Sequence, residues 1–120
     1  APDMRIPIQH ALCYPERIPS GNASCTFELL QSLTFEQWDP QRYPCVSLAY
    51  EAIHKGGTMP AVLNAANDVL VSRFLSGDIY FGEIAKGIAY VMVNYEPIAN
   101  PGLNDILNAI SWAQEFVETY

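Results

Sequence analysis

The chain has 120 residues, half of them hydrophobic, and a formal net charge of −7. This length and composition are sufficient to bury the core of one small domain. A surface this acidic repels nucleic-acid phosphates, so no nucleic acid is expected as a partner. No apolar run approaches the roughly 20 residues needed to cross a bilayer, so no membrane association is expected either.

The first third of the chain is rich in proline and is predicted to be irregular, with short pieces of secondary structure. We expect a short helix at Pro7–Leu12 that Pro15 stops, followed by a turn at Ile18–Asn22. Thr26–Phe35 is predicted to be extended, and Leu33–Phe35 is its best strand candidate. A strand this short needs a partner sheet. Because the chain offers few partners and does not begin with Met, we expect it to be a fragment whose sheet lies upstream.

The remainder is predicted to be helical because its apolar residues recur three and four positions apart. Four amphipathic helices with short connections favour a small antiparallel bundle. The expected helices are Tyr43–Lys55, Thr58–Gly77, Gly82–Tyr95 and a last one that starts at Asn100–Pro101. The predicted fold is therefore mainly α. A C-terminal four-helix bundle spans 43–120, and an irregular segment spans 1–42, with one or two short strands that belong to an upstream α/β domain.

Glycines and a threonine mark particular positions in these helices. Gly56–Gly57 is expected to end the first helix with a left-handed cap. Thr58 is the expected N-cap of the second helix, with Pro60 in its first turn. Gly87 lies inside the third helix, where glycine costs about 1 kcal/mol relative to alanine. We therefore expect a neighbouring helix to approach closely at Gly87.

Side chains that could carry chemistry are few, and no catalytic residue is predicted. The acidic residues are spread along the chain with no Asp-x-Glu or His-x-x-x-His cluster, so no metal site is expected. Gly56–Gly57 follows a predicted helix rather than a strand, which argues against a dinucleotide-binding loop. For His54, in the last turn of a predicted helix, capping or solvation is favoured over catalysis. A surface position is favoured for His10.

Three cysteines at wide spacing form no CxxC pair and are expected to be reduced thiols, as in a reducing compartment: Cys13, Cys25 and Cys45. A small hydrolase with a Cys45–His54 pair would be one alternative function. The two residues lie nine positions apart on one predicted helix, on roughly opposite faces. Contact between them is therefore not expected.

Polar side chains on the second helix leave two interpretations open. Asn64 and Asn67 share a helix face, and Asp68 lies four residues after Asn64. They could form a buried hydrogen-bonded lock between helices or domains, or they could contact a ligand. The lock is favoured because the local charge is negative and no basic residue accompanies them.

Several motifs, taken in order, resemble those of the 1-deoxy-D-xylulose 5-phosphate reductoisomerase family. The most informative is the run Gly56–Asp68, a helix end, a turn and a new helix start followed by amides. The other matching motifs are Pro2–Ile8, Tyr14–Arg17, Leu33–Phe35, Asp39, Tyr43–Cys45, Leu48–Ala49 and Ile79–Phe81. The resemblance weakens after Tyr95, and Gln114 stands where the family often has Arg.

The resemblance implies a function that these residues could serve only in part. The family rearranges 1-deoxy-D-xylulose 5-phosphate and reduces the product to 2-C-methyl-D-erythritol 4-phosphate in non-mevalonate isoprenoid biosynthesis. It uses NADPH and a Mg or Mn ion. By family analogy, Pro2 and Met4 would pack beside the nicotinamide and the substrate.

The same resemblance implies how this piece would act. Its expected partners are the upstream domains of the same chain and a second subunit in a homodimer, and its expected location is the cytoplasm. The helical half would buttress the catalytic domain, and the fragment alone would be inactive and would bind no cofactor. The alternative from another class is a freestanding helical module that binds a partner protein through an apolar groove.

Overall fold

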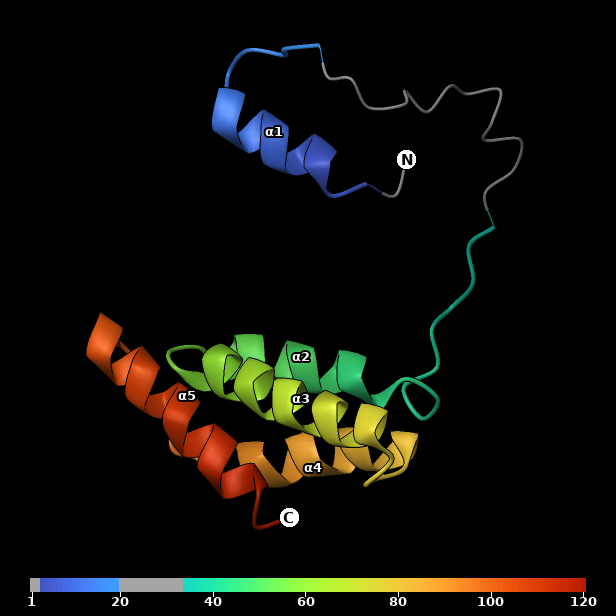
Figure 1. Ribbon diagram of the computed structural model, residues 1–120, viewed down its shortest axis with the longest axis vertical. Coiled ribbons are helices and arrows are strands. Elements are labelled where there is room, and N and C mark those ends of the chain that lie inside the picture. Colours follow the sequence, from blue (N-terminus) through green and yellow to red (C-terminus); the bar gives the residue numbers. More distant parts are fainter. Residues whose placement is uncertain (1–2, 20–33) are drawn as a thin grey trace. The chain divides into compact units, whose positions relative to one another are not determined.

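The computed structural model describes residues 3–19 and 34–120. Contacts between residues divide the chain into two compact units, 1–37 and 38–120. All regular elements within the described residues are helices, which confirms the predicted mainly α fold (Figure 1). Thr34 and Phe35 have no regular structure, so the expected strand is not formed there, and its first residue, Leu33, lies outside the described part. A strand of that length has no sheet to join among these residues.

The first unit contains one short helix, α1 (Arg5–Cys13), which extends the predicted Pro7–Leu12 at both ends. None of its residues is fully buried. The Gln9 side-chain amide donates a hydrogen bond to the backbone carbonyl of Ile18, at 3.1 Å, which ties the helix to the segment that follows it. A helix of nine residues without a buried face is marginal by itself in water.

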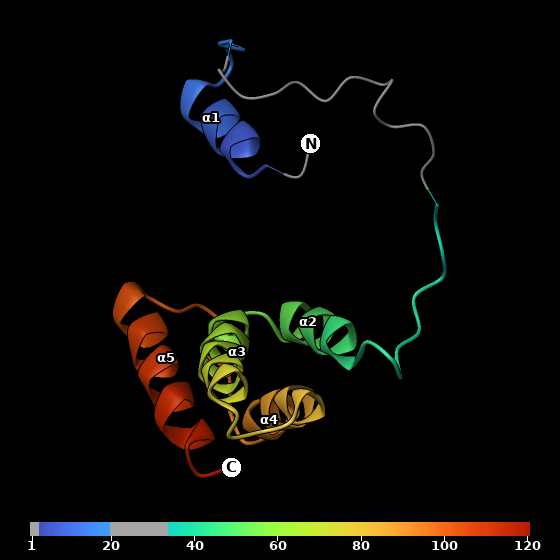
Figure 2. The same ribbon diagram turned by 45° about the vertical axis from the view of Figure 1, so that its right-hand side comes forward.

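The second unit is a four-helix bundle that consists of α2 (Pro44–Lys55), α3 (Met59–Ser76), α4 (Phe81–Val93) and α5 (Leu103–Val117). Each begins or ends within one to three residues of its predicted limits. Helix α3 lies at the centre, with α5 on one side, α2 on the other and α4 against both α3 and α2 (Figure 2).

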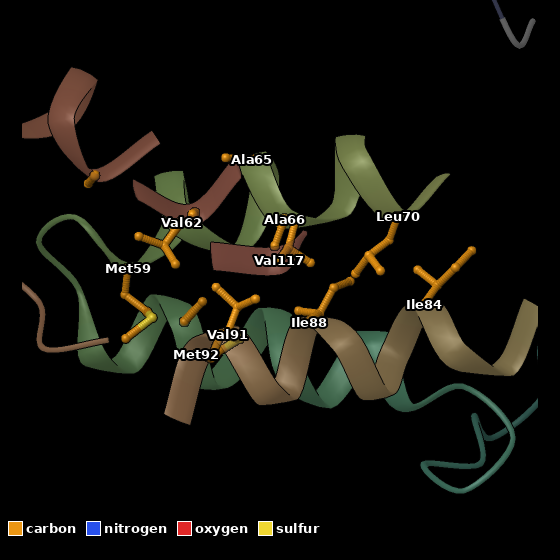
Figure 3. Packing of buried hydrophobic residues seen from close by; sticks show 13 residues of the cluster. Met59, Val62, Ala65, Ala66, Leu70, Ile84, Ile88, Val91, Met92 and Val117 are labelled. Carbon is orange, nitrogen blue, oxygen red and sulfur yellow. The ribbon is translucent and has the colours of Figure 1, made fainter. Parts of the chain in front are cut away.

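The core of the bundle is made mainly by α3 and α4. Its largest fully buried side chains include Met59, Leu70, Ile88 and Met92, which point toward one another between the two helices (Figure 3). Helix α5 contributes small residues and Val117. The close approach predicted at Gly87 is confirmed, because a Cβ atom there would lie 2.7 Å from a methyl group of Leu70.

Aromatic side chains join α4 and its following loop to α5. Tyr95 lies against Trp112, with ring centroids 4.8 Å apart, and Trp112 stacks on Phe116 at 4.7 Å. Phe116 also stacks on Tyr90 at 5.4 Å, and Tyr90 contacts Tyr120 at 5.5 Å. Such pairs contribute roughly 0.5–1.5 kcal/mol each beyond the area they bury. They fix α5 against α4 along one continuous face.

Two helix starts differ from the sequence-based expectation. The last helix begins at Leu103 with Gly102 as N-cap, rather than at Asn100–Pro101. The Asp105 carboxylate accepts a hydrogen bond from the Gly102 backbone N–H at 2.9 Å, and Glu83 does the same for Tyr80 at 2.6 Å. A carboxylate three residues into a helix that accepts the N-cap N–H is a recognisable start signal. The sequence carries this signal at Gly102 and Asp105, so the predicted start of the last helix at Asn100–Pro101 is wrong.

Candidate functional site

The run Gly56–Asp68 forms the sharp turn between α2 and α3 and the first half of α3. Gly56 and Gly57 both have positive φ, 67° and 56°. A Cβ atom on Gly57 would lie 2.1 Å from the carbonyl oxygen of Ile98. Glycine is therefore required twice over at this position, by the backbone conformation and by the α4–α5 loop that lies against it.

Thr58 connects this turn to the α4–α5 loop. Its side chain is fully buried, and it lies at the predicted N-cap position of α3. Its hydroxyl makes no capping bond within α3. The hydroxyl instead hydrogen bonds to Tyr95 Oη at 2.9 Å and accepts the Ile98 N–H at 3.1 Å. The Thr58 N–H donates to the Ile98 carbonyl at 3.2 Å, so the two segments, 40 residues apart, are held together by three hydrogen bonds.

Among the described residues, Asn64, Asn67 and Asp68 form no buried lock between helices, and a lock with another domain stays a prediction. Asn67 is half-buried and lines a groove described below. Asn64 and Asp68 are exposed, and the Asn64 amide donates only to the Asp68 carboxylate, at 3.4 Å. That bond joins neighbours on the solvent face of one helix, where it contributes little. The between-helix form is wrong because α3 buries small and apolar residues, rather than its amides, against its neighbours. Thr58 and Tyr95 make the buried polar connection instead.

The predicted cofactor contact Met4 lies at the start of α1. Its side chain is 72% exposed, and its backbone carbonyl accepts a hydrogen bond from the Ile8 N–H. The Met4 side chain is therefore exposed to solvent, whereas the backbone that carries it is hydrogen bonded. Pro2, the other predicted contact, lies outside the described residues.

Asp3 and Arg5 flank Met4 and form an ion pair. The Arg5 guanidinium donates to both Asp3 carboxylate oxygens, with the shortest N–O distance 2.6 Å, and the Arg5 backbone N–H donates to the same carboxylate at 3.0 Å. The side-chain hydrogen bonds, followed by the backbone one, lower the pKa of Asp3. The side-chain hydrogen bonds to Asp3 also raise the pKa of Arg5. This fork-like pair holds the Met4 turn in place.

The histidines and cysteines form no catalytic pair. Cys45 and His54 are both exposed at opposite ends of α2, about 13 Å apart along the helix axis at 1.5 Å per residue. His10 packs edge-on against Tyr14, with ring centroids 5.9 Å apart. Cys13 and Cys45 are free thiols, whereas Cys25 lies outside the described residues. The Cys45–His54 pair of the hydrolase alternative is therefore not formed.

Helices α2, α3 and α4, with the segment 40–43 that precedes α2, line a groove that the sequence did not suggest. Its volume is about 810 Å³, and its lining is largely apolar, with Val46, Leu48, Val71, Phe81 and Ile84 among the wall residues. Helix α2 is only partly covered. Ala52 is its one fully buried residue, and Ile53 is 67% exposed. No periodicity within one helix could have revealed the groove, because three helices separated in sequence form it.

The described residues were also compared with what a metal site and a membrane-spanning helix require. No three His, Cys, Asp or Glu side chains come close enough to hold a metal ion within residues 3–19 and 34–120. Over the same residues, every helix is too short or too polar to cross a lipid bilayer.

Comparison with known proteins identifies close relatives. A family model described as the DXP reductoisomerase C-terminal domain matches residues 1–116. A 1-deoxy-D-xylulose 5-phosphate reductoisomerase of Pelotomaculum thermopropionicum is 51% identical over 113 residues, which are 94% of this chain and 29% of the relative. The enzyme of the same name from Nitrosomonas eutropha is 51% identical over 114 residues, which are 95% of this chain and 28% of that relative.

Solved structures agree with these relatives. The reductoisomerase of Zymomonas mobilis, in complex with NADPH, matches with a TM-score of 0.85 and 37% identity over 99% of this chain and 32% of its own. A reductoisomerase in complex with NADPH, fosmidomycin and magnesium matches with a TM-score of 0.83 and 31% identity, over 98% of this chain and 31% of its own. The chain thus spans about 30% of the length of these relatives. Their length favours a part of a larger enzyme over a freestanding interaction module.

Proposed function

Because the chain belongs to the DXP reductoisomerase C-terminal domain family, we propose that it is the C-terminal part of a 1-deoxy-D-xylulose 5-phosphate reductoisomerase. The enzyme would convert this substrate to 2-C-methyl-D-erythritol 4-phosphate with NADPH. The observation that carries the proposal is the match over residues 1–116, together with 51% identity to enzymes of that name.

The work of the enzyme is divided between two parts of its polypeptide. Residues 43–120 form a rigid helical support, and residues 1–42 form the end of the catalytic domain and the linker. NADPH and a Mg or Mn ion bind mainly to the remaining part, which makes up about 70% of the relatives' length. Structures of such enzymes in complex with NADPH and magnesium support the choice of these cofactors. The complete enzyme is a cytoplasmic homodimer.

Met4 is the residue of this chain that we assign to the cofactor. Its exposed thioether lies on a turn fixed by the Asp3–Arg5 pair. A flexible, polarizable side chain of this kind packs well against a planar ring such as nicotinamide. Pro2 is the second residue that we assign to apolar packing beside the nicotinamide and the substrate.

The test uses the full-length enzyme that ends in these 120 residues. We expect NADPH oxidation that requires both 1-deoxy-D-xylulose 5-phosphate and Mg or Mn. Replacing Met4 by Ala should raise KM for NADPH by about tenfold, a loss of about 1.4 kcal/mol of binding. The matched variant Met4→Leu keeps the apolar volume and should stay within about twofold of the parent.

Two results would contradict the proposal. One is a full-length enzyme that fails to oxidise NADPH with this substrate. The other is tight binding of NADPH or the metal by residues 1–120 alone, which would place the cofactor site in the wrong part of the polypeptide.

A further inference from the structure

The groove between α2, α3 and α4 differs in charge from the rest of the chain. Two of the six basic residues, Arg42 and Lys86, line it. No acidic residue of the described ranges 3–19 and 34–120 lines it, although the chain carries a formal net charge of −7. The groove thus combines apolar walls with an excess of positive charge on an otherwise acidic protein.

Neither cation of the groove has a carboxylate partner in the described part of the chain. The ion pairs within residues 3–19 and 34–120 join Arg5 to Asp3 and Lys55 to Glu51. The Arg42 guanidinium lies over the Tyr43 ring, 5.5 Å from its centroid, and Lys86 is exposed. Both cations are therefore free to pair with negative groups that enter the groove.

We propose that this groove is the docking site for an apolar segment, bearing at least one carboxylate, from the part of the same polypeptide that lies outside these 120 residues. The inference rests on the proposed function, because it takes the chain to be one part of a longer enzyme. It adds the surface through which the helical support is joined to that enzyme and the chemistry of the segment that it receives.

Large apolar side chains that line the groove are exposed to solvent. Phe81 is 73% exposed, and Val46 is 39% exposed, although both line a concave surface between packed helices. A contiguous concave apolar surface of this kind marks a site of interaction with another chain segment or ligand. A helix or extended segment that places apolar side chains between α2 and α4 would remove these residues from water.

The length of the relatives favours a segment of the same polypeptide as the occupant of the groove. About 70% of each relative lies outside the match, so a large partner is already covalently attached. Its high effective concentration favours docking over association with an independent protein. Because Arg42 and Lys86 make the groove positive, an apolar segment that carries Asp or Glu is favoured over one without a carboxylate.

A zero-length cross-linking experiment on the full-length enzyme tests the proposal. A water-soluble carbodiimide activates a carboxylate, and an amine then displaces the urea to form an amide with net loss of one water. We expect Lys86 to be linked to an Asp or Glu upstream of residue 1 within the same chain, as identified by peptide mass spectrometry. A guanidinium does not form this amide, so the variant Arg42→Lys supplies an amine at position 42. A carboxylate that pairs with that position then becomes detectable. The Lys55–Glu51 pair, 3.0 Å apart, is the internal control for the reagent.

A second measurement follows Cys45, which is exposed here and lines the groove. In the full-length enzyme its alkylation should be at least about tenfold slower than in the denatured enzyme. The double variant Arg42→Glu/Lys86→Glu should restore much of that rate by repelling the carboxylate. The control variant Lys55→Glu, which changes a cation outside the groove, should leave the rate unchanged.

The outcomes are separable. A link from Lys86, or from position 42 in the Arg42→Lys variant, to the upstream part of the same chain supports the proposal. A link only between two chains would assign the groove to a second copy and would overturn the proposal. The absence of any link from the groove, while Lys55 is linked to Glu51, would also overturn the proposal. NADPH oxidation is measured on the same preparations. An active enzyme without the link refutes the docking site alone, whereas a linked but inactive enzyme refutes the proposed function.

Discussion

The two units of this chain differ in where their stability comes from. The bundle of residues 38–120 buries side chains from all four of its helices and joins distant loops by hydrogen bonds. The unit 1–37 offers α1, which has no fully buried residue, and a turn stabilised by one exposed ion pair. The comparison teaches that the run Gly56–Asp68 is an element of the packed scaffold, whereas the turn at Met4 exposes its side chain and contributes to no core among the described residues.

The largest effect that would sharpen this contrast is expected at Gly57. Gly57→Ala forces a Cβ against the Ile98 carbonyl and keeps φ at 56°, so we expect a loss of roughly 4 kcal/mol from strain and overpacking together. Urea denaturation would measure it. Gly77→Ala is the matched control, since its φ is 86° but a Cβ there meets nothing within 4 Å, so a loss of only about 1 kcal/mol is expected. Equal losses in the two variants would refute the Gly57–Ile98 contact.

The next effect concerns core burial on α3. Leu70 is fully buried against α4, so Leu70→Ala should cost about 3 kcal/mol in the free energy of unfolding. Leu75, on the same helix, is 77% exposed, and Leu75→Ala should change stability by less than about 0.5 kcal/mol. Leu12→Ala on α1, at 82% exposure, should resemble Leu75→Ala. A large loss from Leu12→Ala in thermal or urea unfolding would break the contrast between the two units.

A smaller effect is expected where Thr58 joins the two loops. Thr58→Val keeps the shape but removes the hydroxyl that bonds Tyr95 and Ile98, so we expect a loss of about 2 kcal/mol. Thr58→Ser retains the hydroxyl and should lose less. A double-mutant cycle with Tyr95→Phe should give a coupling energy of at least about 0.5 kcal/mol. Strict additivity of the two substitutions would show that this hydrogen bond contributes nothing.

The smallest effect concerns pH and the Met4 turn. Because Arg5 lowers the pKa of Asp3, the pair stabilises the turn at pH values above the ordinary carboxyl pKa. The stabilisation is lost as pH falls through the lowered pKa of Asp3. Carbon-detected NMR titration of the Asp3 carboxyl group should give a lowered pKa in the parent and a less lowered pKa in Arg5→Gln, which loses the guanidinium but keeps the backbone hydrogen bond. An unchanged titration in that variant would mean that Arg5 does not cause the shift.

Sequence alone determined the local features of this protein. The 3.6-residue periodicity, the glycines that end helices and the proline in the first turn of α3 located all four helices of the bundle. These signals are local, because each depends on residues within about four positions of one another. The ordered motifs also identified the family, since a series of short matches in a fixed order is specific even when each is weak.

Tertiary structure decided the features that depend on residues far apart in the chain. Thr58 has the sequence signature of an N-cap, but its hydroxyl serves Tyr95 and Ile98, which lie 37 and 40 residues away. The groove needs α2, α3 and α4 together, and the apolar face of α2 that would have closed it remains partly open. Hydrogen bonds and cavities depend on which surfaces meet in space, and the pattern of a single helix carries no record of its neighbours.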